Sequence, residues 1–306
     1  MSLRQLLPAD QDNPDLAALY AYPDGQWLRA NMVSSADGAA HLDGASAALS
    51  SGTDRRLFAL LRTLSDVIIV GAATARTEHY KPARIQEPWR DLRSSRPPTP
   101  PIAVVTARLD LDPASRLISE APAYARTIVI TTAQAPADRR AELARHADVI
   151  VAGEKTVDLK AAVCALAERG HRRMLAEGGP HLLAQLLEAG RLDELCLTIG
   201  PLMAGPGASR IVAGARPTVP PLPLTLAHVL EDDGFLFCRY LQKRSLGRTG
   251  LVHAPARSQA AHMADSATGR PRSARTASRR IQGRGSRPRS NPVATAAARS
   301  LTPSLA

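Results

Sequence analysis

Glycines and an acid stand at the ends of short apolar runs, at positions where ligands bind in many α/β proteins. Gly178 and Gly179 come between an apolar run and a helical pattern, and Gly71 ends another run in the same way. Glycine lets a ligand approach main-chain atoms, and the first turn of a helix presents unpaired N–H groups to a phosphate. Asp37 places a carboxylate at the end of a third run. Each feature alone is also typical of a tight turn, and an Asx turn is the structural alternative for Asp37.

The elements that must position these residues alternate between apolar runs and amphipathic patterns. Residues 53–64 place four leucines at i, i+3, i+4 and i+7, which indicates a helix. We expect strands at 27–33, 66–70, 102–106, 127–131, 148–151, 172–176, 194–199, 224–230 and 235–240, and further helices at 72–77, 136–145, 159–169 and 179–189. This order predicts an α/β fold with a doubly wound mixed sheet, mostly parallel, that ends in an antiparallel hairpin. In such sheets ligands lie across the carboxyl ends of the strands.

Charge divides the chain of 306 residues, which has 39 basic and 28 acidic side chains. Residues 243–306 hold 13 basic side chains and one acid, Asp265, and contain no Phe, Trp or Tyr. We therefore expect an N-terminal extension over 1–26, one folded domain over 27–242 and a disordered Arg/Ala/Ser-rich tail over 243–306. The folded part is almost neutral, so nucleic acid is an unlikely partner. We expect the tail to have no function or to be translated from read-through or out-of-frame DNA. The alternative is an arginine-rich arm that binds RNA.

Other classes of protein are excluded by missing patterns. The three cysteines are far apart, no His or Cys spacing predicts a metal site, and the H-x-E with P-C-x-x-C signature of zinc deaminases is absent. Walker A and G-x-S-x-G sequences are also absent. No apolar run is long enough to span a membrane, so a cytoplasmic location is expected. Residues 82–101, rich in Pro and Arg, predict a surface loop.

Four segments in order resemble the C-terminal reductase domain of the bifunctional riboflavin-biosynthesis deaminase/reductase, and more closely the stand-alone pyrimidine reductases of actinobacterial type. They are RANMVSSADG at 29–38, VGAATARTE at 70–78, EGGPHLL at 177–183 and DELCLTIGPL at 193–202. The resemblance covers about residues 27–240. It implies a dihydrofolate-reductase-like fold, NADPH as hydride donor and a homodimer built with the C-terminal strands.

The resemblance also assigns cofactor-binding residues. It implies a first phosphate turn at Gly71, Ala72, Ala73 and Thr74 and a second at Gly178 and Gly179. Thr106 and Arg108, at the end of the strand expected over 102–106, stand where the 2′-phosphate of NADPH binds. A guanidinium pairs bidentately with phosphate, which suits Arg108, although a solvated loop arginine is the alternative. Ala73 stands where the family usually has Gly, so one methyl group must fit beside the cofactor.

Substrate recognition then falls to Asn31, Ser35, Asp37 and Glu177. We expect the Asp37 carboxylate, at the floor of a cleft, to accept N–H groups of an aminopyrimidine or pterin edge. Glu177 could supply a proton near the reduced carbon or, alternatively, cap the next helix. The expected activity is hydride transfer to the ribosyl C1′ of a diaminopyrimidinone ribosylamino phosphate, similar to 5-amino-6-(5-phosphoribosylamino)uracil reductase. The alternatives are reduction of a pterin, which shares the 2-amino-4-oxo edge, and a non-catalytic module with a nucleic-acid-binding tail.

Overall fold

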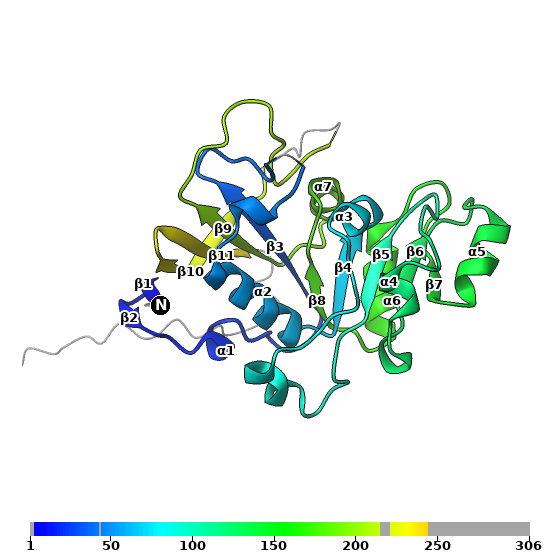
Figure 1. Ribbon diagram of the computed structural model, residues 1–306, viewed down its shortest axis with the longest axis horizontal. Coiled ribbons are helices and arrows are strands. Elements are labelled where there is room, and N and C mark those ends of the chain that lie inside the picture. Colours follow the sequence, from blue (N-terminus) through cyan, green and yellow to red (C-terminus); the bar gives the residue numbers. More distant parts are fainter. Residues whose placement is uncertain (1–2, 43, 215–220, 244–306) are drawn as a thin grey trace, which may run out of the picture. The chain divides into compact units, whose positions relative to one another are not determined.

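The computed structural model describes residues 3–42, 44–214 and 221–243 (Figure 1). Within them, eleven strands form one sheet in the order β2-β1-β10-β11-β9-β3-β8-β4-β5-β6-β7. The strands are β1 Arg4–Leu7, β2 Gln11–Asp12, β3 Trp27–Ser35, β4 Val67–Gly71, β5 Ile102–Val105, β6 Ile128–Thr131, β7 Asp148–Val151, β8 Arg173–Ala176, β9 Glu194–Gly200, β10 Leu224–Asp232 and β11 Phe235–Gln242. The helices are α1 Leu16–Leu19, α2 Gly52–Leu64, α3 Ala72–Thr77, α4 Arg116–Ser119, α5 Ala137–Ala144, α6 Leu159–Glu168 and α7 Pro180–Glu188, with 3-10 turns η1 Ala47–Leu49, η2 Glu87–Arg93 and η3 Ala123–Ala125.

The predicted α/β mixed sheet is confirmed. All neighbouring pairs from β9 through β3, β8, β4, β5 and β6 to β7 are parallel, and β11, β10, β1 and β2 add antiparallel pairs. The expected hairpin is β10 and β11, in which Asp232 lies opposite Phe235. Residues before Trp27, expected as an extension, contribute β1 to the same sheet, where Arg4 pairs with Glu231. The tail from residue 244 lies outside the described residues.

Helices cover both faces of the parallel part of the sheet (Figure 1). On one face, α2 buries its leucine stripe, including Leu57 and Leu61, in a cluster with Leu230 and Phe237. On the other face, α6 and α7 pack against β3, β4 and β8 in a second apolar cluster. Residues on parallel strands are therefore buried on both sides, as their continuous apolar sequence predicts. No helix of the described ranges is long and apolar enough to cross a membrane.

A buried ion cluster ties β3 to β9 and β11. The Glu194 carboxylate accepts hydrogen bonds from Arg29 (2.6 Å), Arg239 (2.7 Å) and the Trp27 indole (2.8 Å). Both Glu194 and Arg29 have side chains that are 0% exposed. Burial opposes the charge of Glu194, but Arg29 and Arg239 hold the pKa of its carboxyl well below the usual value. The Arg29 guanidinium also donates to Tyr20 O (2.8 Å). Because a buried charge needs a partner, this cluster fixes the pairing of the central strands.

Candidate active site

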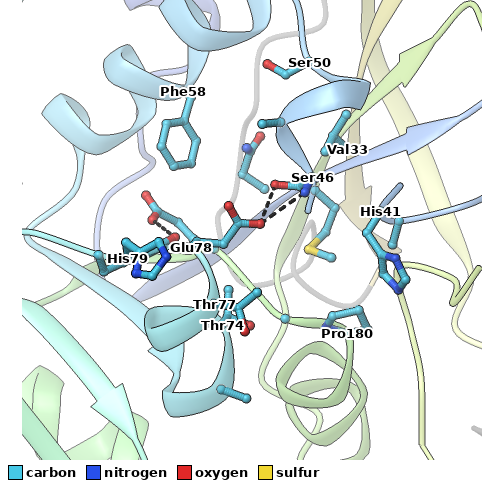
Figure 2. Close-up of a pocket in the computed structure, with 18 of the residues that line it drawn as sticks. Val33, His41, Ser46, Ser50, Phe58, Thr74, Thr77, Glu78, His79 and Pro180 are labelled. Atoms are coloured by element: carbon cyan, nitrogen blue, oxygen red, sulfur yellow. Dashed lines mark hydrogen bonds between the residues drawn. The ribbon is translucent and has the colours of Figure 1, made fainter. Parts of the chain in front are cut away.

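A pocket of about 890 Å³ lies where β3, β4 and β8 end. Its walls come from α2, from α3, from the segment after α3 and from the connection β8–α7. In Figure 2, Phe58, Glu78, His79 and Pro180 surround the same hollow. Ser46 closes one side and donates its hydroxyl to Glu78 Oε1 (3.0 Å). The pocket is therefore at the carboxyl edge of the sheet, as expected for a doubly wound fold.

The two glycine turns meet in this pocket. Gly71 N donates to Gly178 O at 3.0 Å, and the peptide bond between Gly178 and Gly179 is cis. A Cβ at Gly179 would lie 2.5 Å from Thr74 Oγ1, and Gly178 has φ +94°. Gly178 therefore requires glycine because of its left-handed backbone, and Gly179 because a Cβ would collide with the Thr74 side chain.

The remaining cofactor-binding candidates divide between the pocket and its surroundings. Ala73 and Thr74 line the pocket, whereas Ala72 packs into the core. Ala73 is exposed, so its methyl group is tolerated without moving the turn. Thr106 and Arg108 follow β5 and lie outside the pocket lining. Thr106 Oγ1 accepts a hydrogen bond from Leu109 N (3.0 Å), and Arg108 is exposed.

Glu177 forms the polar floor of the pocket. Its carboxylate accepts two hydrogen bonds from Arg62 (2.6 and 2.7 Å) and one from the Tyr80 hydroxyl (2.8 Å). Burial disfavours the Arg62 charge, yet Glu177 raises the pKa of Arg62 above the ordinary value. The Glu177 side chain is 1% exposed. The alternative that Glu177 caps the next helix is wrong, because the N-cap of α7 is Gly179 with no side-chain cap. Three donors make Glu177 an acceptor that holds Arg62 in place.

Asp37 lies elsewhere, so its expected place at the floor of the cleft is corrected. It is exposed and is not part of the pocket lining. Its carboxylate accepts hydrogen bonds from Gly205 N (2.9 Å), Ala204 N (3.1 Å) and the Ser35 hydroxyl. These donors, Ser35 first, lower the pKa of Asp37 to about 2. Asp37 therefore joins two loops, and Ser35 supports it from the end of β3. Of the expected substrate ligands besides Glu177, Asn31 does line the pocket.

Asp54 is a further carboxylate of the pocket lining, beside Glu177 and Glu78, and the sequence prediction missed it. Ser50 Oγ and Thr198 Oγ1 each donate to it at 2.6 Å. Asp54, Phe58 and Arg62 follow one another at intervals of four along α2, so they form one stripe facing the pocket. This four-residue spacing can be seen in the sequence. The leucine stripe on the same helix is the stronger pattern, and it indicates only an amphipathic helix.

Basic side chains surround the mouth of the pocket. Arg55, Lys81 and Arg84 line it and are exposed. Their side chains form no ion pair or hydrogen bond within the described ranges, although Lys81 and Arg84 interact electrostatically with Glu120. Arg116 also lines the pocket and forms an ion pair with Glu120. Exposed cations at a pocket mouth are suited to a phosphate group.

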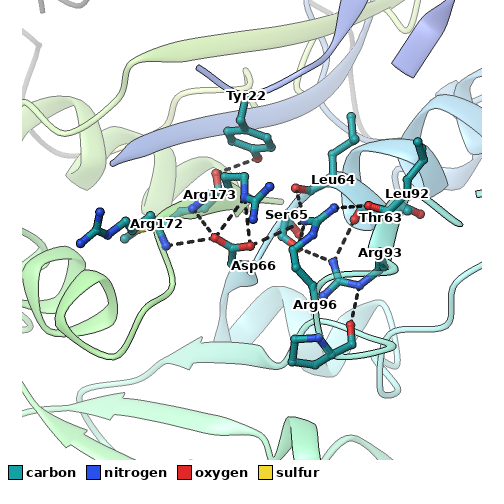
Figure 3. Close-up of polar contacts among 12 residues, drawn as sticks. Tyr22, Thr63, Leu64, Ser65, Asp66, Leu92, Arg93, Arg96, Arg172 and Arg173 are labelled. Atoms are coloured by element: carbon teal, nitrogen blue, oxygen red, sulfur yellow. Dashed lines mark hydrogen bonds and ion pairs between the residues drawn. The ribbon is translucent and has the colours of Figure 1, made fainter. Parts of the chain in front are cut away.

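Two arginines of the 82–101 segment hold that segment against the C-terminal end of α2 (Figure 3). Arg93 donates to Thr63 O (2.9 Å) and Ser65 O (2.6 Å), and Arg96 donates to Leu64 O (2.8 Å). These carbonyls belong to the last turn of α2, where no intrahelical donor remains. Burial and the nearby Arg96 lower the pKa of Arg93 to about 10. The expected surface loop is therefore partly ordered as η2 and anchored by a buried arginine.

We expect Arg93→Met to lower the free energy of unfolding by about 2–4 kcal/mol, because several buried carbonyls lose their donor. Urea unfolding of the variant and of Arg90→Met is the measurement. Arg90 is on the same turn, but its side chain is 67% exposed and, among the residues that the structure describes, pairs with Glu87 alone. Equal stabilities of the two variants would show that Arg93 does not anchor the segment.

A mostly parallel sheet with paired glycine turns beside a polar pocket agrees with the reductase class, of dihydrofolate-reductase-like fold, that the resemblance implies. The chain belongs to the RibD C-terminal domain family, whose family model matches residues 26–235. The resemblance found in the sequence is thus confirmed, and with it the class of oxidoreductase.

Individual relatives agree with this family. A protein of Archaeoglobus fulgidus called 2,5-diamino-6-ribosylamino-4(3H)-pyrimidinone 5′-phosphate reductase is 30% identical over 51% of this chain and 71% of its own length. A pyrimidine reductase-like protein of Corynebacterium diphtheriae has a similar structure, with TM-score 0.66 and 31% identity over 71% of this chain and 92% of its own. The Thermotoga maritima deaminase and 5-amino-6-(5-phosphoribosylamino)uracil reductase shares the fold, with TM-score 0.54 and 17% identity over 71% of this chain and 57% of its own.

Proposed function

We propose that this protein reduces a ribosylamino pyrimidine phosphate with NADPH. The observation that carries the proposal is the pocket itself. The turns at Gly71 and Gly178 contact each other beside it, Gly179 and carboxylates line it, and exposed cations lie at its mouth. The name of the Archaeoglobus fulgidus relative supports the same substrate class.

The glycine turns fit a dinucleotide. Gly179 has no side chain and lines the pocket together with Thr74, so its main chain is open to a ligand. The first turn of α7 adds N–H groups and the positive end of a helix dipole for the pyrophosphate. Gly71, Ala73, Thr74, Gly178 and Gly179 would then hold the cofactor, and Thr106 and Arg108 would flank its 2′-phosphate.

The reaction changes only the sugar. When bound, the nicotinamide supplies one hydride, and thus two electrons, to the ribosyl C1′. The C1′–O4′ bond breaks, its electron pair stays on O4′, and O4′ takes one proton from solvent. The product is an open-chain ribitylamino group. The protein positions the sugar through Glu177 and Arg62 and binds the phosphate through Lys81, Arg84 and Arg55.

Turnover with defined substrates tests the proposal. NADPH oxidation is followed at 340 nm with the ribosylamino pyrimidine phosphate, with the same compound lacking phosphate and with dihydrofolate. We expect the phosphorylated compound to have the highest kcat/KM and to yield a ribityl product. Faster reduction of dihydrofolate would establish the pterin alternative, and absence of turnover with all three would overturn the proposal.

The choice of NADPH over NADH depends on Arg108 in this proposal. We expect wild type to bind NADPH at least about tenfold tighter than NADH, because one charge-assisted contact contributes about 1.5–3 kcal/mol. Arg108→Gln should bring the two dissociation constants close together, as measured by fluorescence titration. Arg126→Gln, which changes an arginine that pairs with Asp148 instead, is the control. An unchanged preference in Arg108→Gln would remove this residue from the cofactor site.

We also propose that two copies pair through β1 and β10. Leu7, Leu224 and Leu226 are 46%, 36% and 40% exposed, and the strand register places them on one face with Tyr240. Apolar side chains gathered on one sheet face favour contact with a second copy. Light scattering should give a dimer for wild type and a monomer for Leu226→Glu.

A further inference from the structure

We infer that Glu120 pairs with cations at the pocket mouth and must be displaced by a phosphomonoester, so that this acid lowers the affinity of the pocket for phosphate. The inference rests on the proposed function for the identity of the ligands and goes beyond it, because no step of the reaction involves Glu120. Both expected ligands carry a phosphomonoester, as the 5′-phosphate of the pyrimidine compound and as the 2′-phosphate of NADPH. Binding measurements distinguish these two sources.

Glu120 holds one complete edge of the Arg116 guanidinium. Arg116 lines the pocket at the start of α4, and Glu120 ends the same helix outside the pocket lining. Arg116 Nε donates to Glu120 Oε1 at 2.5 Å, and Arg116 Nη2 donates to Oε2 at 3.1 Å. Two parallel donors of this kind are also the edge that pairs bidentately with a phosphate. A phosphate that takes this edge therefore replaces the carboxylate.

Two further cations of the mouth act on the same acid. The hydrogen bond from Arg116 is the main cause that lowers the pKa of Glu120, and the charges of Arg84 and Lys81 lower it further. Arg84 and Lys81 both line the pocket and are exposed. Glu120 is therefore ionised at neutral pH, and it reduces the positive charge that these three cations present to a ligand.

The ion pair between Arg116 and Glu120 can open easily. The two side chains are 55% and 40% exposed, and exposed pairs contribute little to stability. The arginine also precedes the glutamate along the helix, which is the less favourable order for such a pair. A phosphomonoester carries a charge of about −1.5 to −2, whereas a carboxylate carries a single negative charge. The mouth cations therefore favour the phosphate once it arrives.

The acids that line the pocket have other partners. Glu177 forms its ion pair with Arg62 at the pocket floor, and Glu78 accepts a hydrogen bond from the Ser46 hydroxyl. Within the described ranges, the ion pair of a mouth cation is that between Arg116 and Glu120. Removal of this one carboxylate therefore changes the mouth and leaves the polar floor of the pocket as it is.

The test measures dissociation constants by calorimetry for wild type and Glu120→Gln. The ligands are the ribosylamino pyrimidine phosphate, the same compound without phosphate, NADPH and NADH. We expect Glu120→Gln to bind a phosphorylated ligand about three- to tenfold tighter than wild type and its unphosphorylated counterpart equally well, because the competing carboxylate is gone. A gain for the pyrimidine phosphate identifies the 5′-phosphate as the displacing group, and a gain for NADPH identifies the 2′-phosphate. Added salt should narrow the difference, since the charges are exposed.

Two further variants separate competition at Arg116 from a general effect of charge. Glu142→Gln removes an acid from the exposed pair with Arg139 on α5, outside the pocket lining, and should leave every dissociation constant unchanged. Arg116→Gln removes the donor edge, so the affinity for the same phosphorylated ligand should fall about three- to tenfold. In the Arg116→Gln background, Glu120→Gln should change this affinity less than about twofold, because both residues act through one contact.

Weaker phosphate binding in Glu120→Gln would show that the acid positions Arg116 for the ligand. Unchanged binding, or an equal gain with and without phosphate, would show that it does not compete. Each of these results overturns the inference while the proposed function stands. If wild type reduces no pyrimidine compound, the proposed function fails, and phosphorus NMR titrations with inorganic phosphate still decide the role of Glu120 by the same comparison. If Glu120→Gln does not fold, Glu120→Ala is measured in its place and the same outcomes apply.

Discussion

Glu177→Gln is expected to lower kcat/KM about 100- to 1,000-fold. The amide keeps the shape of the carboxylate but can no longer accept both hydrogen bonds from Arg62, so a guanidinium at the pocket floor loses its anion. Loss of one partner from such a pair costs about 3–4 kcal/mol when the remaining charge is desolvated. Because the Glu177 side chain is only 1% exposed, water cannot replace it.

Steady-state kinetics on Glu177→Gln and Tyr80→Phe separate the effect of the Glu177–Arg62 ion pair on kcat/KM from that of the Tyr80 hydroxyl. Tyr80→Phe removes one donor and leaves the Arg62 pair, so it should cost less than about tenfold. Thermal unfolding and NADPH affinity of the same samples show whether the fold and the cofactor site persist. A variant Glu177→Gln that keeps wild-type kcat/KM would mean that the substrate does not reach the pocket floor.

Glu194→Gln is expected to lower the free energy of unfolding by about 3–5 kcal/mol. The substitution preserves volume, but it leaves Arg29 and Arg239 facing each other without the anion between them. Urea unfolding checks this result. Glu120→Gln is the matched control, because it removes an acid from the exposed helical pair with Arg116 and should leave the urea midpoint unchanged. Equal midpoints for both variants would contradict the importance of the cluster.

The same substitution changes the response to acid. The pKa of Glu194 is lower in the folded protein than in the unfolded chain, so the unfolded chain binds a proton more readily. The stability from this group is therefore complete above about pH 4.3 and is lost as the pH falls below that value. Wild type should lose this contribution during acid titration, and Glu194→Gln, which lacks it at every pH, should not.

Local sequence patterns predicted the centre of the fold and part of the site. The strands β4 and β8 are short apolar runs ended by glycine, and their parallel pairing follows from the helices between them. For the same reason the contact between the Gly71 and Gly178 turns could be expected. By contrast, β1 has four residues and pairs with β10, more than 200 residues later, so nothing local marks it. Its membership of the sheet depends on a distant strand.

The roles of the acids could not be read from local sequence. Asp37 and Asp54 both stand near glycines, and both could be turn or cap residues. Which of them faces the ligand depends on the packing of α2 over the ends of β3 and β9, where Thr198 contacts Asp54. It also depends on the loop around Ala204, whose main-chain N–H donates a hydrogen bond to the Asp37 carboxylate. Both contacts join residues more than 140 positions apart, and short-range spacing carries no information about them.

The strand order also determines when the pocket can form during synthesis. The strand β3 lies between β8 and β9, although about 140 and about 160 residues separate it from these strands along the chain. A nascent chain that has emerged only as far as α6 has α2 and β3 but lacks Glu177, the second glycine turn and Thr198. Closing such a long loop is slow, and until then β3 has no partner strand and β4 lacks one on the edge that later pairs with β8. The pocket is thus among the last parts to form, and the unfinished chain depends on protection from aggregation until β8 and β9 arrive.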